Sequence, residues 1–277
     1  TERPPLPTPQ VPADRTTFSR RLPSPLVYDY HLHSNYSDGR FLPQMVRAAS
    51  DAGLDGIGFA DHCNVSARES MQSTRAVFGF NLDRTYERRR HAIGRLRERA
   101  DITVYDAVEM DYDPRDEAEI RAFLDDAGFD YAIGSVHTVG EYNIQSPGQY
   151  EGLSDAELDR VVDHYFDNLV ALAESELFDV AAHPDLFERT PQLRSRATQD
   201  HYRRAAEAFA DSRTVPEINA GRALADEEFV HPHDSFLDEL LARDVAITVG
   251  TDSHRPHEVA DRAAFLDAFT EIGRAHV

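Results

Sequence analysis

The sequence predicts an α/β fold in which seven parallel strands form a barrel, and three observations support this prediction. Short β-like runs alternate with helical stretches from Val27 onward, which is typical of parallel strands joined by helical crossovers. Every one of the seven runs ends in residues of metal-ligand or polar type. All C-terminal strand ends converge on one face of a closed barrel, whereas the outer strands of an open sheet hold theirs too far apart to share a site.

The seven strands are predicted from the apolar runs. They cover residues 27–31, 56–60, 103–108, 131–136, 178–182, 215–219 and 245–249. Helices are predicted between them. The helix at 43–52 has Pro43 in its first turn and Gly53 after its end, in the usual order of these two residues. The helix at 154–174 begins with a capping box, in which Ser154 is followed three residues later by Glu157. The other predicted helices cover 83–99, 198–210, 233–242 and 256–272.

A length of 277 residues with 41% apolar residues suits one domain with a sizeable core. We divide the chain into an N-terminal arm at 1–26 and a barrel domain at 27–277. Seven prolines in the arm favour an extended, flexible segment. The sequence has no signal-peptide pattern, and no apolar run approaches the ~20 residues of a membrane span. We therefore expect a cytoplasmic protein with no membrane partner.

The composition is strongly acidic, with a net charge of -21 and no lysine among its 29 basic residues. This charge repels nucleic-acid phosphates, so we expect no binding to long nucleic acids. Acidity without lysine also suits a halophilic protein, because salt in the cytoplasm screens the repulsion. A high genomic GC content is the alternative explanation for arginine in place of lysine. No oligomeric state is predicted.

Candidate metal ligands follow the predicted strands. His31 and His33 are two residues apart on a strand, which places both imidazoles on one face. Asp252 and His254 repeat that spacing near the end of the chain. The single cysteine, Cys63, excludes a cysteine-cluster site. A lone histidine is more often a packed core residue, but that explanation becomes weak for a whole set at strand ends. The set comprises His31, His33, His62, Glu109, His137, His183, Asp252 and His254.

The remaining histidines serve as a comparison. Four of them lie in or beside predicted helices or at the terminus, and we interpret them as surface residues: His91, His164, His201 and His276. Three others lie in loops or at helix starts, where a surface position is again the favoured interpretation, although one of them could enter the site: His231, His233 and His257.

With these residues assembled, the chain resembles the PHP (polymerase and histidinol phosphatase) superfamily, and most closely its monofunctional histidinol-phosphatase branch. Its four motifs are matched by His31-Leu32-His33, Asp61-His62, Gly134-Ser135-Val136-His137 and Asp252-Ser253-His254. Further matches are Tyr28 to Ser34 with Ser37-Asp38-Gly39, Phe129 to His137, Ala182 to Leu186 and Glu217-Ile218-Asn219. The segment 64–81 departs from the family pattern. The resemblance implies a distorted seven-stranded (β/α)7 barrel of the PHP type.

The resemblance also implies a trinuclear centre of three divalent ions, for which Zn, Mn and Fe all suit the ligand types. The first ion would be held by His31, His33, Glu109 and Asp252. The second would be held by Asp38, His62 and His254. The third would be held by His137 and His183, with Glu109 bridging to the first.

Clustered metal ions suit phosphate-ester hydrolysis, because they activate water and stabilise charge on the phosphoryl oxygens. Lysine is absent, so arginine must supply the cationic donors, and its planar fork suits phosphate. The candidate catalytic residues are Arg189, Arg222, Asn219 and Asp185, the last as a residue that orients a ligand or protonates the leaving group.

The leading hypothesis is a phosphatase that hydrolyses a small phosphorylated substrate, L-histidinol phosphate or a similar monoester, within histidine biosynthesis. One alternative is a PHP phosphoesterase acting on nucleotides or oligonucleotide ends, since the acidic charge does not exclude mononucleotides. A second alternative is a non-catalytic PHP module that serves a partner protein. All the expected ligands are present, which disfavours that module.

Overall fold

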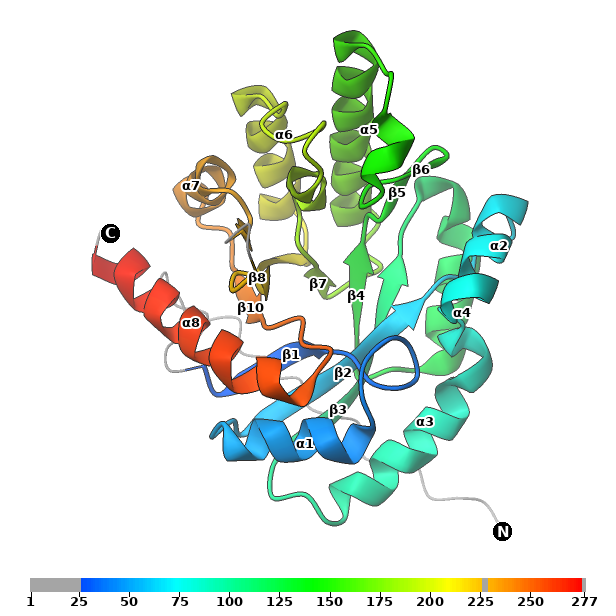
Figure 1. The fold of residues 1–277 in the computed structure, drawn as a ribbon, viewed down its shortest axis with the longest axis vertical. Helices are drawn as coiled ribbons and strands as arrows, with labels where there is room; N and C mark the ends of the chain where they lie inside the picture. The colour runs from blue at the N-terminus through cyan, green and yellow to red at the C-terminus, as the bar shows by residue number, and fades with distance from the viewer. Residues whose placement is uncertain (1–25, 226–228, 276–277) are drawn as a thin grey trace.

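The computed structural model describes residues 26–225 and 229–275, and it has the predicted α/β architecture (Figure 1). Seven strands form one sheet in the order β1-β2-β3-β4-β7-β8-β10, and the neighbours along this path are parallel. Their bounds are Tyr28–Leu32, Gly56–Cys63, Thr103–Asp111, Tyr131–Ser135, Val180–Ala181, Val215–Arg222 and Thr248–Gly250.

The two ends of the sheet meet just beyond β1 and β10. Leu32 and Ser253 form a parallel bridge, and the backbone N–H of His33 donates to the carbonyl of Ser253 at 3.0 Å. This contact brings the first and last strands together and curls the sheet toward a barrel. The predicted fold class, an α/β fold with seven parallel strands curled into a distorted barrel, is confirmed.

Each predicted strand has a counterpart, but several continue further than predicted. β8 reaches Arg222 instead of Asn219, and β2 and β3 run past His62 and Glu109. We placed the ends of these last two strands before His62 and Glu109, and that was wrong: β2 reaches Cys63 and β3 reaches Asp111. The pairing of the two strands continues without interruption through His62 and Glu109, which are direct partners. These polar residues can belong to the strands because the side chains of His62 and Glu109 face the site and not an apolar layer.

The six predicted helices are present as α1 Leu42–Asp51, α3 Leu82–Arg97, α5 Asp155–Glu174, α6 Gln199–Ala210, α7 Asp234–Ala242 and α8 Pro256–Ala275. The capping box of Ser154 and Glu157 begins α5 as expected. Two helices were not predicted, α2 Glu69–Phe78 and α4 Glu117–Ala127. The first lies in the segment 64–81 that departs from the family pattern. The helices surround the strands (Figure 1).

Three short strands were also not predicted. β5 Thr138–Val139 and β6 Tyr142–Asn143 form an antiparallel pair after His137. β9 Phe229–His231 pairs antiparallel with β8, with His231 opposite Asn219. The favoured surface interpretation of His231 is therefore wrong: its side chain is fully buried, because the return of the chain along β8 carries it inward.

The barrel interior is filled by small apolar residues beneath the ligand-type side chains. Ala60 and Ala107 lie two residues before His62 and Glu109 on their strands, so each pair shares a face. Both alanines are buried in one cluster with Ile133, Val180 and Ala182. A larger cluster, to which Phe59 belongs, packs on the outer face beneath the helices. These two layers hold the strand ends rigidly under the site. The arm predicted at 1–26 lies outside the described residues except for Leu26.

Candidate metal centre

The first group of ligand-type side chains comes from β1 and the segment after β10. His31 and His33 point to the same face while Leu32 is buried opposite. Their Nε2 atoms lie 3.3 and 3.4 Å from Oε2 of Glu109. His33 Nε2 lies 3.3 Å from Oδ1 of Asp252. His31, His33 and Asp252 each offer a ligand atom within a 4.8 Å cluster.

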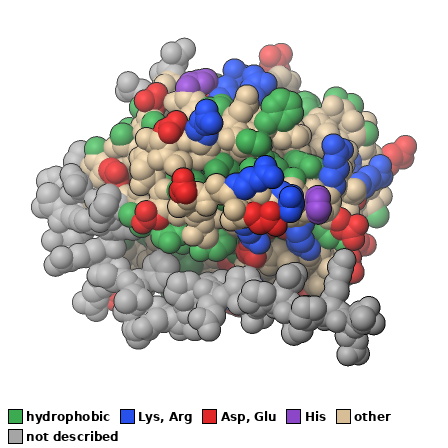
Figure 2. Space-filling view, turned by 90° about the horizontal axis from the view of Figure 1, so that it is seen from below, with side chains coloured by type: hydrophobic (Ala, Val, Ile, Leu, Met, Phe, Trp, Pro, Cys, Tyr) green, Lys and Arg blue, Asp and Glu red, His purple; other side chains and the backbone are tan. Residues whose placement is uncertain are grey.

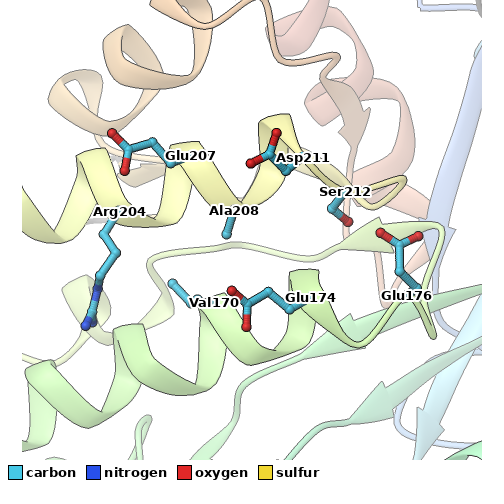
Figure 3. Close-up of a pocket in the computed structure, with 8 residues that line it drawn as sticks. All are labelled: Val170, Glu174, Glu176, Arg204, Glu207, Ala208, Asp211 and Ser212. Carbon is cyan, nitrogen blue, oxygen red and sulfur yellow. The ribbon is translucent and has the colours of Figure 1, made fainter.

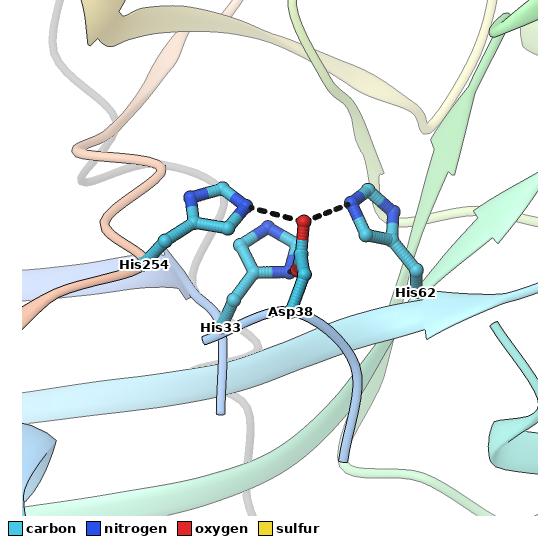
Figure 4. Close-up of side chains that lie close together, drawn as sticks. All are labelled: His33, Asp38, His62 and His254. Atoms are coloured by element: carbon cyan, nitrogen blue, oxygen red, sulfur yellow. Dashed lines mark ion pairs between the residues drawn. The ribbon is translucent and has the colours of Figure 1, made fainter. Parts of the chain in front are cut away.

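The second group lies around the carboxylate of Asp38, in the loop that follows β1. Oδ2 of Asp38 lies 3.3 Å from Nε2 of His254 and 3.9 Å from Nε2 of His62 (Figure 4). His33 completes this group, with Nδ1 3.6 Å from Oδ1 of Asp38. The three imidazoles therefore surround one carboxylate, as Figure 4 shows.

The third group consists of His62, Glu109 and His137. Nδ1 of His62 lies 2.9 Å from Oε2 of Glu109, and Nε2 of His137 lies 3.5 Å from Oε1. His183, which the resemblance assigns to the third ion, lies outside these groups but contacts Oε1 of Glu109 through Nε2 at 3.1 Å. All nine ligand candidates thus converge on one face, with Glu109 at their centre.

These residues fit divalent metal ions, because buried ligand atoms lack hydrogen-bond partners. They include Nε2 of His31, Nε2 of His33, Nδ1 of His62, Oε2 of Glu109 and Nδ1 of His183. A buried polar atom without a partner is costly, and such atoms are rarely clustered unless something binds them. The nitrogens of His31, His33 and His62 each lie within 3.4 Å of that Oε2 of Glu109.

Two imidazoles of the centre are held in the neutral form that binds metal. Burial, together with His254 and His62, lowers the pKa of His33 to about 4. Burial likewise lowers the pKa of His183 to about 4. Both rings therefore offer a free lone pair at neutral pH.

The pKa of His62 moves the other way. Burial alone would lower it, but attraction to Glu109 and Asp38 outweighs burial and raises the pKa to about 10. The neighbouring imidazoles hold the pKa of Glu109 well below its usual range despite its burial. The carboxylates of the centre thus favour protonation of His62, and a divalent ion would take the place of that proton.

Carboxylates behind the ligands orient the imidazoles. Nδ1 of His31 lies 2.9 Å from Oε1 of Glu217, which directs Nε2 into the site. Nδ1 of His137 contacts Asp111 in the same way. Sequence reasoning assigned neither carboxylate a role. Alternation could have found both: Glu217 precedes Asn219, and Asp111 follows Glu109, by two residues on a strand.

The backbone is strained at two of the ligand candidates. His183 has φ 30° and Asp252 has φ 51°, in the left-handed region that residues other than glycine seldom adopt. Such conformations cost about 1–3 kcal/mol and persist where the surrounding structure compensates for them. Their position at the centre indicates that its geometry was retained at the expense of local stability.

The candidate phosphate-binding residues lie beside the first group. Arg189 donates from Nη2 to Oδ1 of Asn219 at 3.2 Å, and the same nitrogen lies 3.7 Å from Oδ2 of Asp252. Arg189 and Arg222 line one pocket of about 190 Å³. Asp185 is fully buried, and its carboxylate contacts His231 and the backbone N–H of His233. Its oxygens are therefore engaged away from that pocket.

A larger pocket lies elsewhere and has the wrong chemistry for an anion. It measures about 390 Å³ and lies between α5 and α6, where four carboxylates and one arginine, Arg204, line it (Figure 3). These are Glu174, Glu176, Glu207 and Asp211. The pocket contains no imidazole, so we place no part of the reaction there.

A β/α barrel with imidazoles and carboxylates gathered at the C-terminal ends of its strands defines a metal-dependent hydrolase. The PHP domain model matches residues 29–221. The chain belongs to the PHP domain family.

Curated relatives match most of the chain. The "Probable histidinol-phosphatase" of Deinococcus radiodurans is 25% identical over 254 residues, which cover 88% of this chain and 92% of that protein. The histidinol-phosphatase of Lactococcus lactis is 27% identical over 247 residues, which cover 82% and 83%. Both matches cover more than four fifths of each protein.

A solved structure shares the fold. It is the histidinol phosphate phosphatase of Lactococcus lactis in complex with Zn, L-histidinol and phosphate. The TM-score is 0.67 at 23% identity, and the match covers 88% of this chain and 94% of the other. Among the described residues, no helix has the length and apolar character needed to cross a membrane.

Proposed function

We propose that this protein is a metal-dependent phosphatase that hydrolyses a small phosphate monoester, with L-histidinol phosphate as the favoured substrate. The observation that carries the proposal is the unpartnered set of ligand atoms around Glu109, beside a pocket that contains two arginines. A cluster of metal ligands next to fixed cationic donors suits a dianionic phosphoryl group.

We assign nine residues to three divalent ions, which would be Zn, Mn or Fe. The geometry supports one ion between His31, His33 and Asp252, and one beside Asp38 and His254. Glu109 lies where it can contribute to more than one ion, since His31, His33, His62, His137 and His183 all approach its oxygens.

In the proposed reaction, divalent ions supply Lewis acidity to the phosphoryl oxygens and to water. Arg189 and Arg222 donate N–H groups to the phosphate and hold it against the metal centre. Asn219 accepts from Arg189 and so limits the rotation of its guanidinium. Glu217 and Asp111 hold His31 and His137 in the orientation that presents the opposite ring nitrogen to the ions.

The organic part of the substrate would extend along the same pocket that Arg189 and Arg222 line. Pro147 and Phe229 give this pocket apolar surface, and Gln145 adds an amide. A planar heterocycle such as imidazole suits such a lining. The named activity of the Deinococcus and Lactococcus relatives supports the same choice.

The surface gives no support to a long nucleic acid as substrate. On the face shown in Figure 2, basic and acidic side chains are interspersed and no continuous basic stripe is visible. The net charge of the chain is -21, which opposes the approach of a polyanion. We also propose that the acidic, lysine-free composition adapts a cytoplasmic protein to high salt.

Phosphate release from histidinol phosphate and from a panel of monoesters and nucleotides, measured at high salt with Zn²⁺ or Mn²⁺, tests the function. Histidinol phosphate should have the highest kcat/KM, and a chelator should abolish turnover. Arg189→Gln or Arg222→Gln should raise KM about ten-fold or more, because a hydrogen bond to a charged group contributes about 1.5–3 kcal/mol.

Arg203→Gln is the matched control, since Arg203 lies exposed on α6. Preference for nucleotides would transfer the assignment to a different phosphoesterase. Bound metal with no hydrolysis of any ester would overturn the enzymatic role.

A further inference from the structure

Histidine 231 is fully buried and lies beside the metal centre without belonging to its ligands. It ends β9 opposite Asn219 on β8, and its ring lies 6.2 Å from that of His183 between centroids. A buried imidazole next to an active site can serve either packing or hydrogen bonding. The partners of its two ring nitrogens show which role it has.

Both nitrogens of His231 have charged partners. Nε2 lies 2.7 Å from Nε of Arg189, and Nδ1 lies 2.5 Å from Oδ1 of Asp185. A guanidinium can only donate, so Nε2 must accept. The proton of the neutral ring is therefore on Nδ1, from which it is donated to Asp185.

Asp185 in turn accepts on both oxygens. Oδ2 receives the backbone N–H of His233 at 2.6 Å, and Oδ1 receives His231. The carboxylate is fully buried, and no open side remains for substrate. The hydrogen bonds therefore all point the same way. Arg189 donates to His231, and His231 donates to Asp185.

We propose that His231 is a positioning residue for Arg189, and that Asp185 sets this role by holding the imidazole in the tautomer protonated on Nδ1. The inference rests on the proposed function, because Arg189 is assigned there to the phosphate. With Nε engaged by His231 and Nη2 engaged by Asn219, the guanidinium is held in one plane at the wall of the pocket. In this arrangement Asp185 acts on the phosphate site only through His231 and Arg189, and it is not a general acid.

Three substitutions separate positioning from packing. His231→Phe keeps the ring but removes both hydrogen bonds. His231→Gln can offer its carbonyl oxygen to Arg189 and its amide to Asp185. In Asp185→Asn the amide NH2 group must donate, so it faces another donor, either the backbone N–H of His233 or Nδ1–H of His231. If it faces His231, the ring must move its proton to Nε2. That nitrogen can then no longer accept from Arg189. The control is His91→Gln, at an exposed position of α3.

The main measurements are KM and kcat for the monoester and binding of inorganic phosphate by titration calorimetry. His231→Phe and Asp185→Asn should each raise KM and weaken phosphate binding about ten-fold, with a smaller change in kcat and unchanged metal content. His231→Gln should recover to within about three-fold of the wild type. Equal effects of Phe and Gln, or no effect of Phe, would overturn the proposal.

A spectroscopic readout does not depend on a variant folding. Nitrogen-15 spectra of the Zn²⁺-loaded wild type, labelled at histidine, should show His231 neutral and protonated on Nδ1. Protonation on Nε2 would overturn the inference even if the enzyme is active. A wild type that binds phosphate but hydrolyses no monoester would instead refute the proposed function, so the two failures are distinguishable.

Discussion

Glu109 on β3 and His62 on β2 are direct partners in a parallel register, and Oε2 of the glutamate lies 2.9 Å from Nδ1 of the histidine. Four further imidazoles approach the same carboxylate. A glutamate at the point where all of these converge controls the charge of the whole centre.

Replacing Glu109 by glutamine should therefore remove metal and activity together, because an amide cannot balance the charge of two cations. Metal content measured by mass spectrometry should fall by at least one ion per chain, while circular dichroism stays unchanged. Glu98→Gln, at an exposed position after α3, should behave as wild type. Normal metal content in Glu109→Gln would exclude a bridging role.

Metal uptake should release protons. Without metal the pKa of His62 is raised to about 10, and that of His31 lies well above its usual range, so both rings are protonated at pH 7 and must lose a proton to bind an ion. Apparent affinity for Zn²⁺ should rise as pH increases from 7 toward 10. Calorimetry in two buffers of different ionisation enthalpy measures the number of protons; identical heats in both buffers would contradict the shifts.

The same raised pKa affects the stability of the metal-free protein. Its folded state binds more protons than the unfolded state between pH 6.5 and about 10. The resulting stabilisation is present in full below pH 6.5 and is lost as pH rises through 10. Denaturant midpoints of the chelated protein should fall over this window, and the metal-loaded protein is the comparison.

The ion pairs of Arg89 support the loop that carries Asp38. Arg89 is fully buried between Asp61, at 2.7 Å, and Asp106, at 2.8 Å. Asp61 also accepts from the backbone N–H of Ser34 at 2.6 Å. Arg89→Met leaves the buried carboxylate of Asp61 without its cation, whereas Asp106 keeps Arg90 at 2.7 Å. We expect a loss of about 3–5 kcal/mol in the free energy of unfolding.

Arg95→Met provides the control for Arg89. Arg95 pairs with Glu98 on the exposed surface, where an ion pair contributes no more than about 1 kcal/mol. Similar denaturation midpoints for the two variants would show that burial of Arg89 contributes little.

Gly250 leaves room for the carboxylate that orients His31. A Cβ at this position would lie 1.9 Å from Oε1 of Glu217 and 2.9 Å from Cβ of His31. Gly250→Ala should therefore displace Glu217 and weaken metal binding about ten-fold or more, the effect expected when a partner behind a metal ligand is lost. Gly148→Ala, where a Cβ would meet nothing within 4 Å, is the control for the added methyl group.

Activity should increase from low to molar salt. The phosphate must approach a local positive site against the field of a chain of net charge -21, and at 1 M salt the Debye length is only about 3 Å. Initial rates and denaturation midpoints over a series of KCl concentrations test both effects. A maximum rate without added salt would contradict adaptation to a saline cytoplasm.

The seven barrel strands could be predicted because each apolar run ends in a change of residue type. The ends of β2 and β3 could not be predicted in this way, because His62 and Glu109 are polar residues that continue their strands. Only the pairing of the two strands shows that they do so. The antiparallel strand β9 was missed for a similar reason: three residues are too few for a period to be visible.

The convergence of the candidate ligands could be predicted because alternation on a strand places side chains on a known face. The residues behind the ligands were harder to find. Glu217 and Asp111 lie on strands and follow the same alternation, but His231 reaches the site only through a return of the chain along β8. No local pattern around His231 encodes that contact with Arg189.

The seam between β1 and β10 has a consequence for synthesis of the protein. Its bridge joins Leu32 to Ser253. The side chains next to that bridge, His31 and His33 on one side and Asp252 and His254 on the other, belong to the same proposed metal centre. The ligand set is therefore complete only after residue 254 has left the ribosome. A nascent chain that lacks this part can build most of the sheet but cannot acquire the full metal complement, so a translation product truncated before β10 would be inactive.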